Sequence, residues 1–357
     1  MKPFSAGYYI KKNKGRAIII IFMMLLTTMM YMVGNYIESL WWNWGKGIEY
    51  DDKMAIATVV PPNIDEYRDF VNEINADENL IVFGQSGHSF GGELWKTTMG
   101  FEMGGPSISF KSVDDMKVVF ERLGIKCDYT NLKNHSVVMS RMYADNLNKN
   151  IGDTFKDGLF TLDALIDDDS FVFFYIYEEP DPDDWYNMMI MSDTMSGDEL
   201  RNYVRNIIGD RNIAVGDGVK HGLEGPLGSV KYIFYAVVAI ISIMIAVTLN
   251  SVITGQYIKR NYEFAIYGAI GISKKMIRRK VANELLTMDF IAIVIGTIVI
   301  FLASFILNEM LYKPKGMYLP YFSIIGVIGV IIGNVLVVGP LIFFKGRKMC
   351  KIDVTEF

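Results

Sequence analysis

Residues 87–91, GHSFG, could provide a catalytic nucleophile, because they match the G-x-S-x-G pattern of hydrolase nucleophile elbows. Ser89 would be the nucleophile, with His135 or His221 as its base. However, four residues separate the apolar strand predicted at Leu80–Phe83 from the His-Ser pair, whereas an elbow is itself the turn that leaves its strand. A glycine-rich surface loop is therefore the favoured interpretation, and a membrane hydrolase that uses Ser89 is the alternative.

Two acidic runs could hold a metal ion, because carboxylate oxygens are the ligands that Ca²⁺ prefers. They are Asp167-Asp168-Asp169 and residues 178–184, EEPDPDD, and they flank one predicted strand. The EF-hand spacing of acidic residues is absent from both runs. The sequence also has no His/Cys spacing typical of zinc sites. We therefore predict no resident metal, with calcium at the acidic runs as the alternative.

The sequence contains no G-x-x-x-x-G-K-[ST] pattern, the loop that cradles nucleotide phosphates. We therefore expect no cofactor in this chain, and any ATP and Mg²⁺ that drive it must be bound by another polypeptide. Glu284 and Asp289 lie near the start of the third predicted membrane helix and could relay protons. Their position beside a basic segment favours ion pairs or contact with water instead.

That basic segment, residues 259–284, reads KRNYEFAIYGAIGISKKMIRRKVANE and joins the second and third apolar runs. It carries seven Lys or Arg, against Glu263 and the closing Glu284. Ser273 can cap a short helix that Gly271 separates from the preceding one. The helix would have an apolar face, formed by Ile272, Met276, Ile277 and Val281. Its basic face would be formed by Lys274, Lys275, Arg278 and Arg279. It is either a docking surface for a partner or a loop that sets topology.

Four long uncharged runs could each cross a bilayer, whose core of about 30 Å requires ~20 helical residues. They lack the alternation of barrel strands. We therefore predict four transmembrane helices at residues 17–37, 229–258, 285–308 and 321–344. The second has no helix breaker between about Gly228 and Tyr267, so it should extend beyond the membrane as a stalk.

Basic residues beside the predicted helices indicate which side of the membrane each loop occupies. The tail 1–16, the segment 259–284 and the tail 345–357 are all basic and should be cytoplasmic. The first apolar run is too long for the core of a signal peptide and lacks a cleavage site, so we expect it to remain as a membrane helix. Residues 38–228 and the short loop 309–320 should then lie outside the cytoplasm, in a multi-pass protein of the cell membrane.

The predicted external region, residues 38–228, holds 34 Asp or Glu against 16 Lys or Arg. This acidic balance argues against nucleic-acid binding, which needs a basic face. Cys127 would lie outside and Cys350 inside, so the two cannot form a disulfide with each other. A region of this size can instead be stabilised by its own hydrophobic core.

Strand and helix patterns alternate through this region, which indicates an α+β domain. Strands are expected at Met54–Val60, Leu80–Phe83, Ser136–Met139, Phe171–Tyr177 and Asn187–Met191. Helices are expected at residues 63–75, 113–123, 140–148 and 196–209, the last opened by a capping box of Ser196 and Glu199. The domain could have two lobes, connected through the glycine-rich stretch 84–106 and the acidic stretch 178–184.

Taken together, these features resemble an FtsX/MacB-type (type VII) ABC transporter permease. The layout of one span, a large external domain and three further spans is similar to that family. So is the cytoplasmic segment, where Arg260, Glu263, Gly271 and Glu284 match the family motif. Residues 138–155 and the ending 352–357 are also similar, although Val354 stands where the family usually has Pro.

The resemblance implies a subunit that lacks enzymatic activity and pairs with a cytoplasmic ABC ATPase dimer and a second permease, identical or related. It would transmit ATP-driven motion to a MacB-like external domain, for export of a peptide, antimicrobial or lipid-linked substrate. An external adaptor, peptide or wall protein is a further expected partner. The ATPase would contact Gly271, Ser273, Lys274, Lys275, Met276, Arg278 and Arg279. The alternatives are a membrane-anchored sensor or adaptor, and an FtsX-like regulator of cell-wall hydrolases.

Overall fold

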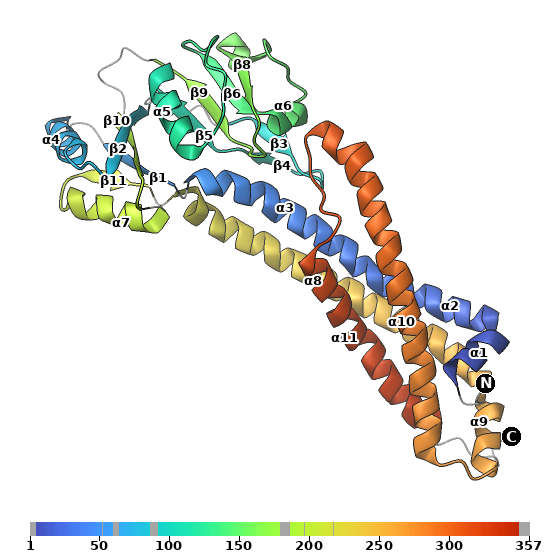
Figure 1. Cartoon of the computed structure of the whole chain (residues 1–357). Coiled ribbons are helices and arrows are strands. Elements are labelled where there is room, and N and C mark those ends of the chain that lie inside the picture. Colours follow the sequence, from blue (N-terminus) through green and yellow to red (C-terminus); the bar gives the residue numbers. More distant parts are fainter. Residues whose placement is uncertain are drawn as a thin grey trace. The chain divides into compact units, whose positions relative to one another are not determined.

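A computed structural model of the chain describes residues 5–51, 53–59, 64–85, 92–178, 186–195, 197–216 and 218–349. The chain divides into two compact units (Figure 1). The first unit, which contains the apolar helices, comprises Met1–Glu38, Lys231–Leu307 and Leu319–Phe357. The second, an α+β unit, comprises Ser39–Val230 and Asn308–Tyr318. It therefore covers the predicted external domain together with most of the predicted loop 309–320.

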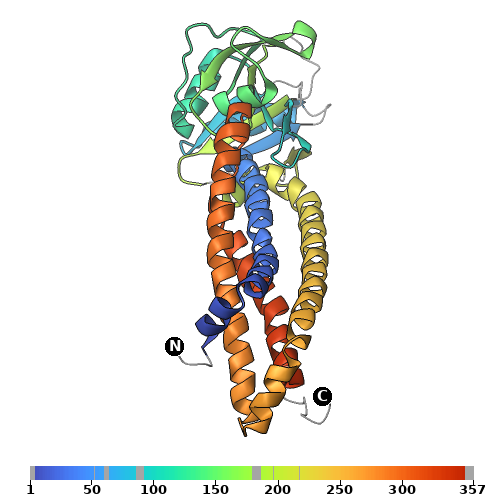
Figure 2. The same ribbon diagram turned by 90° about the vertical axis from the view of Figure 1, so that its right-hand side faces the viewer.

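Helices build the first unit, and two of them, α3 and α8, also contribute residues to the second. In chain order they are α1 (Ala6–Lys12), α2 (Lys14–Leu25), the 3₁₀ turn η1 (Leu26–Thr28), α3 (Met29–Asp51), α8 (Gly218–Ile258), α9 (Asn261–Ala269), α10 (Lys274–Leu307) and α11 (Ile324–Met349). Helix α10 packs against both α2 and α11 (Figure 2). Apolar residues from these helices, including Met24, Leu249, Leu285 and Leu341, form the core of this unit.

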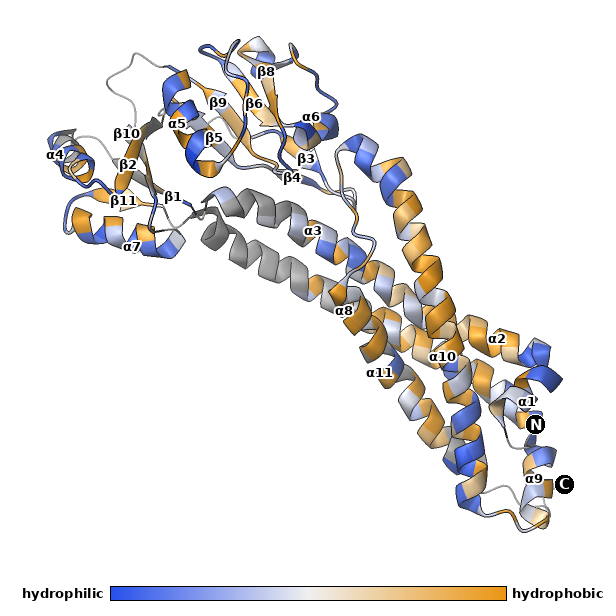
Figure 3. Cartoon of the chain, viewed as in Figure 1, coloured by the Kyte–Doolittle hydropathy of each residue, from blue (hydrophilic) through white to orange (hydrophobic). Residues whose placement is uncertain are grey.

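Three helices in the described part of the chain are long and apolar enough to cross a membrane. They are Lys14–Leu40, Ala239–Ile258 and Lys274–Lys315, and apolar colouring dominates the middle of α2 and α10 (Figure 3). The 41 residues of α8 span about 60 Å, roughly twice a bilayer core, although the helix ends at Ile258 rather than near Tyr267. The predicted fourth span, residues 321–344, overlaps most of the 26-residue α11 and stays a prediction.

Polar side chains connect these apolar helices at buried positions. The Thr27 hydroxyl lies 3.1 Å from Asn334 Oδ1, and Asn35 Nδ2 donates to Ser304 Oγ at 2.8 Å. Glycines in α10 and α11 allow close approach, since a Cβ at Gly296 would overlap the Thr28 side chain and one at Gly326 would meet the Tyr31 backbone. Close packing of small residues and interhelical hydrogen bonds are what hold helices together in lipid.

The described residues of the second unit form two main sheets and a hairpin. The first sheet is antiparallel, ordered β11-β1-β10-β2, with β1 (Met54–Val59), β2 (Leu80–Gln85), β10 (Tyr186–Ser192) and β11 (Ile213–Val215). The second is mixed, ordered β5-β9-β6-β8-β7, with β5 (Ser107–Phe110), β6 (Ser136–Ser140), β7 (Thr154–Phe155), β8 (Phe160–Ile166) and β9 (Phe173–Ile176). The hairpin pairs β3 (Leu94–Lys96) with β4 (Glu102–Gly104).

Among the described residues, four α-helices that lie wholly within this unit and several short helical turns complete it. The helices are α4 (Ile64–Asn75), α5 (Val113–Leu123), α6 (Arg141–Leu147) and α7 (Gly197–Ile208). The turns are η2 (Lys156–Gly158), the π-helical η3 (Asn308–Tyr312) and η4 (Lys313–Lys315). Phe70 of α4 and Leu200 of α7 pack with Ile190 in a core beside the first sheet.

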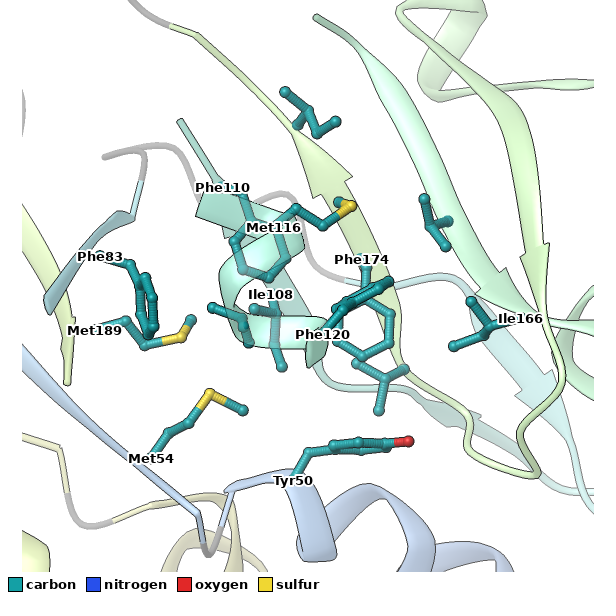
Figure 4. Packing of buried hydrophobic residues seen from close by; sticks show 14 of the residues in the cluster. Tyr50, Met54, Phe83, Ile108, Phe110, Met116, Phe120, Ile166, Phe174 and Met189 are labelled. Atoms are coloured by element: carbon teal, nitrogen blue, oxygen red, sulfur yellow. The ribbon is translucent and has the colours of Figure 1, made fainter. Parts of the chain in front are cut away.

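The two sheets share a hydrophobic core, so they do not form separate lobes. Met54, Phe83 and Met189 from the first sheet pack with Phe110 and Phe174 from the second (Figure 4). Of the two predicted connections, residues 86–91 and 179–185 lie outside the described part of the chain. A shared core makes this unit a single folding body rather than two.

Most predicted elements of this unit are confirmed, because their end signals are local. Ser112 Oγ accepts from the Asp115 amide at 3.1 Å to start α5, and Gly124 ends it with a φ of 71°. Strand β8 and the short strands β3, β4, β5, β7 and β11 were not predicted. Ser196 of the predicted capping box lies outside the described residues, although α7 follows it.

Candidate functional site

The segment between α8 and α10 contains the residues that the sequence singled out. Helix α8 ends at Ile258, a turn at Lys259-Arg260 follows, and α9 runs to Ala269. Gly271 has a φ of +80°, a left-handed conformation that glycine adopts without strain. Its amide donates to the Gly268 carbonyl at 3.0 Å, so it reverses the chain between α9 and α10.

The predicted short amphipathic helix is wrong in one respect, because it is the start of α10 rather than a separate helix. Ser273 caps it as expected, accepting from the Met276 amide at 3.4 Å. Ile277 and Val281 of its apolar face are buried in the core of the first unit. An apolar face buried by its own chain cannot seat in a groove on a partner. Met276 and the basic residues are what remains exposed.

Arg260 is the centre of a group of charges of which Glu263 alone is partly exposed, at 36%. Its guanidinium donates to Glu263 at 2.8 and 3.1 Å and to Glu284 at 2.7 and 3.4 Å. The Arg260 side chain is 3% exposed and Glu284 is fully buried. Two carboxylates thus receive four N–H groups from one planar guanidinium, a geometry that lysine cannot reproduce.

Lys280 completes this group, which we call the ionic cluster: Arg260, Glu263, Lys280 and Glu284. The Lys280 ammonium lies 3.1 Å from Glu284 and 3.9 Å from Glu263, and its side chain is 3% exposed. The Tyr267 hydroxyl donates to Glu263 at 2.9 Å. Two cations and two anions leave the cluster neutral, as a buried group of charges must be to limit its desolvation cost.

Aromatic rings surround the Arg260 guanidinium where the carboxylates do not. Its Cζ lies 4.2 Å from the ring centroid of Tyr9, 4.9 Å from that of Phe264 and 5.2 Å from that of Tyr257. Each distance is within the range of a cation–π attraction. Because Tyr9 belongs to α1, the cluster joins α1, the α8–α9 turn and α10.

The pKa shifts agree with a charged cluster. Burial lowers the pKa of Arg260, but hydrogen bonds to Glu263 and Glu284 outweigh burial, so the pKa is raised. Burial raises the pKa of Glu263, but the hydrogen bond from Arg260 and its charge outweigh it, so the pKa is lowered. Burial and the bond to Glu263 raise the pKa of Tyr267 to about 12. Arg260 and Glu263 are therefore both ionised at neutral pH.

The first turns of α10 present an exposed basic surface next to the cluster. We call it the basic tip, and it comprises Lys274, Lys275, Met276, Arg278 and Arg279. At the same end of the unit, the apolar residues Tyr262 and Ile270 are exposed, with 67% and 71% of their surface accessible to solvent. Basic residues around exposed apolar side chains are typical of a protein-binding surface rather than a catalytic site.

The residues predicted as possible proton-relay groups have different surroundings. Glu284 lies between Arg260 and Lys280, which agrees with the ion-paired interpretation. Asp289 is buried one and a half turns further along α10, and its Oδ1 has no hydrogen-bond partner among the described residues.

The other candidate sites are not assembled in the part of the chain that the structure describes. No group of three His, Cys, Asp or Glu side chains there could hold a metal ion. Asp168 instead accepts from Tyr50 Oη at 2.6 Å and from the Ser170 amide, beside a pocket of about 360 Å³. Ser89 and residues 179–184 lie outside the described residues. His135 adopts a left-handed turn and stacks on Tyr177, at 5.4 Å between ring centroids.

Sequence reasoning missed Tyr9, Tyr257 and Lys280 as members of this site. One local signal was present, since Lys280 precedes Glu284 by four residues and so shares its helix face. No spacing in the sequence could have connected Tyr9 with Arg260, about 250 residues away. That contact depends on how α1 packs against α10.

The comparisons with known proteins concern the carboxy-terminal third of the chain. Residues 232–350 match the model of the FtsX-like permease C-terminal domain. Among curated proteins, no match to this sequence was found. The matched region includes the ionic cluster and the basic tip, whereas Tyr9 lies outside it. The motif residues Arg260, Glu263, Gly271 and Glu284 all lie within the matched region, so this third of the chain is similar to the C-terminal domain of FtsX-like permeases.

Proposed function

We propose that this chain is the transmembrane subunit of an ABC transporter, and that a separate ATPase docks on the basic tip. The observation that carries the proposal is the position of the tip. It is exposed, and it continues directly into a helix whose next turn is anchored by the ionic cluster.

A surface that transmits motion must not yield when it is pushed. Glu284 belongs to the same helix as the basic tip and accepts from Arg260 in the turn at the end of α8, and Lys280 of that helix pairs with Glu284. Because breaking a buried charge pair costs about 3–5 kcal/mol, a displacement of the tip should move α8 and α10 together. Helix α8 contributes residues to both units, so it provides a continuous element along which the displacement could pass.

The chemistry of the tip also indicates its partner. Exposed Lys274, Lys275, Arg278 and Arg279 suit an acidic surface, and Met276 together with Ile270 suits an apolar contact within it. The partner would be an ABC ATPase dimer that binds ATP and Mg²⁺ itself. Two ATPase subunits require two permeases, so a second copy of this chain or a related chain completes the assembly.

The second unit would then be the part that acts on the transported molecule. Its residues lie in the acidic region 38–228, with 34 acidic against 16 basic side chains, and such a surface favours cationic molecules. We infer export or extrusion of a peptide, antimicrobial or lipid-linked substrate, with the second unit outside the cytoplasm and both termini inside.

Charge reversal at the tip tests the docking proposal. We expect permease-stimulated ATPase activity to fall at least tenfold in the triple variant Lys274→Glu, Lys275→Glu and Arg278→Glu. The reason is that three attractive contacts become repulsive. The measurement is phosphate release by the ATPase that co-purifies with the tagged full-length chain in detergent.

The matched control is three charge reversals on exposed residues of the second unit, Lys117→Glu, Lys126→Glu and Arg141→Glu. This variant has the same net charge and should keep full stimulation. A tip variant that retains the bound, fully stimulated ATPase would show that the ATPase does not dock there.

A further inference from the structure

The residues that contact Arg260 fall into two groups, those close to it in sequence and those distant from it. Tyr257, Glu263 and Phe264 are within four residues of it, so the α8–α9 segment brings them along wherever it goes. Glu284 and Tyr9 are distant in sequence and belong to α10 and α1. Only contacts of this second kind can hold the α8–α9 turn at a defined position against the rest of the unit.

Tyr9 makes the closest ring contact to Arg260, at 4.2 Å, and its side chain is 3% exposed. Its hydroxyl is buried and has no hydrogen-bond partner among the described residues. The face of the ring, rather than the hydroxyl, therefore makes the interaction.

The short helix α1 holds that ring in place. Ser5 Oγ accepts from the Tyr8 amide at 3.3 Å at its start, and the Asn13 amide donates to the Tyr9 carbonyl at 2.9 Å at its end. Helix α1 packs against both α2 and α10. Tyr8, Lys11 and Lys12 on its other side are exposed. The buried face of α1 thus presents Tyr9 to Arg260.

We propose that Tyr9 is a positioning residue of the coupling machinery, which acts by covering the Arg260 guanidinium and holding it in its paired geometry. The inference rests on the proposed function above. The ring excludes water from the cation while attracting it, so Arg260 stays paired with Glu263 and Glu284. Without the ring, water reaches the guanidinium, the α8–α9 turn loosens from α10, and a push at the basic tip is transmitted less effectively.

Aromatic electrostatics separate this role from simple filling of space. Fluorine withdraws electron density from the ring face while hardly changing the size of the side chain, so it weakens a cation–π attraction without creating a cavity. Position 9 of the full-length chain is therefore replaced by phenylalanine and by its mono-, di- and trifluoro derivatives through amber suppression. Stimulated ATPase activity and thermal unfolding are measured in detergent with the co-purified ATPase.

Tyr9→Phe should keep stimulation within about twofold of the native chain, because the ring face is retained. Stimulation should then fall progressively with fluorination, by about fivefold for the trifluoro derivative. In an Arg260→Gln background the same fluorination series should be flat, because the cation that the ring attracts has been removed.

The outcomes separate this inference from the proposed function. Equal stimulation across the fluorination series, with the native chain stimulating its ATPase, would show that Tyr9 has no positioning role and would leave the ATPase proposal intact. A fall that persists with Arg260→Gln would also overturn the role, since the ring would then act elsewhere. A native chain that binds no ATPase would overturn the proposed function and this inference with it.

Discussion

Arg260 shows how a motif residue acquires its chemistry. In sequence it is one of seven basic residues in a segment of 26, and the other six carry the same charge. In the structure it is 3% exposed and bound by two carboxylates and three aromatic rings. Buried ion pairs add little net stability but enforce a single geometry in some proteins. This property suits a position that has to pass on a displacement.

Cys127 of the second unit allows a prediction at the scale of one residue. Burial, reinforced by the negative charge of Asp128, raises the pKa of its thiol to about 11. At pH 8 the thiolate, which is the reactive form, is then scarce in the folded protein. A Cys350→Ser variant should react with iodoacetamide more than about tenfold slower when folded than in guanidinium, where the thiol pKa returns to about 8.5.

The neighbouring position provides the control for this measurement. Lys126 is exposed, so Lys126→Cys combined with Cys127→Ser should react at nearly the same rate in the folded and unfolded states. Raising the pH toward 11 should accelerate labelling of folded Cys127 as the thiolate forms. Rapid labelling of folded Cys127 at pH 8 would contradict the raised pKa.

At the scale of elements, the contact of α10 with the η1 turn leaves no room for a larger side chain. The chain leaves α-helical geometry at Leu26–Thr28, where the Thr28 hydroxyl bonds the Leu25 carbonyl at 2.5 Å. Gly296 of α10 faces this turn, and a Cβ there would overlap the Thr28 side chain. A side chain larger than hydrogen at position 296 would therefore collide with Thr28.

Replacing Gly296 by alanine should therefore destabilise the protein, by about 1–3 kcal/mol, because the added methyl group forces the helices apart. The measurement is thermal unfolding of the purified chain in detergent. Gly329→Ala in α11 is the matched control, since its Cβ would lie 3.6 Å from the Met30 carbonyl, an ordinary contact. It should be neutral or stabilising by up to about 1 kcal/mol, because alanine favours the helix. Equal stabilities of the two variants would refute this packing argument.

At the scale of the whole molecule, charge is divided along the sequence. Residues 38–228 are acidic, whereas the segment 259–284 and both tails are basic. Basic loops are retained on the cytoplasmic side during insertion. This asymmetry predicts that the second unit and the basic tip lie on opposite sides of the membrane.

Labelling of single cysteines tests this topology. In a Cys127→Ser, Cys350→Ser background, Lys117→Cys should react with a membrane-impermeant maleimide on intact cells, and Lys275→Cys should not. Both positions are exposed, so both should react after permeabilisation, which serves as the control. Labelling of Lys275→Cys on intact cells would mean that the orientation is inverted.

The sequence by itself determined the apolar helices, most of the α+β elements and the identity of the motif residues. Hydropathy, capping residues such as Ser112 and Gly124, and the spacing of Arg260 and Glu263 are local properties, and local properties can be read without a fold. It also placed Glu284 beside the basic segment, but without assigning it a partner.

Only the tertiary structure decided what covers each apolar helix face and which distant residues meet. It turned the apolar face of residues 272–281 largely inward, merged the predicted short helix into α10, and joined the sheets of the second unit through one core. It also brought Tyr9 onto Arg260. The physical reason is that cation–π contacts and the covering of an apolar face depend on the packing of segments distant in sequence, and a local pattern does not record which distant segment will pack there.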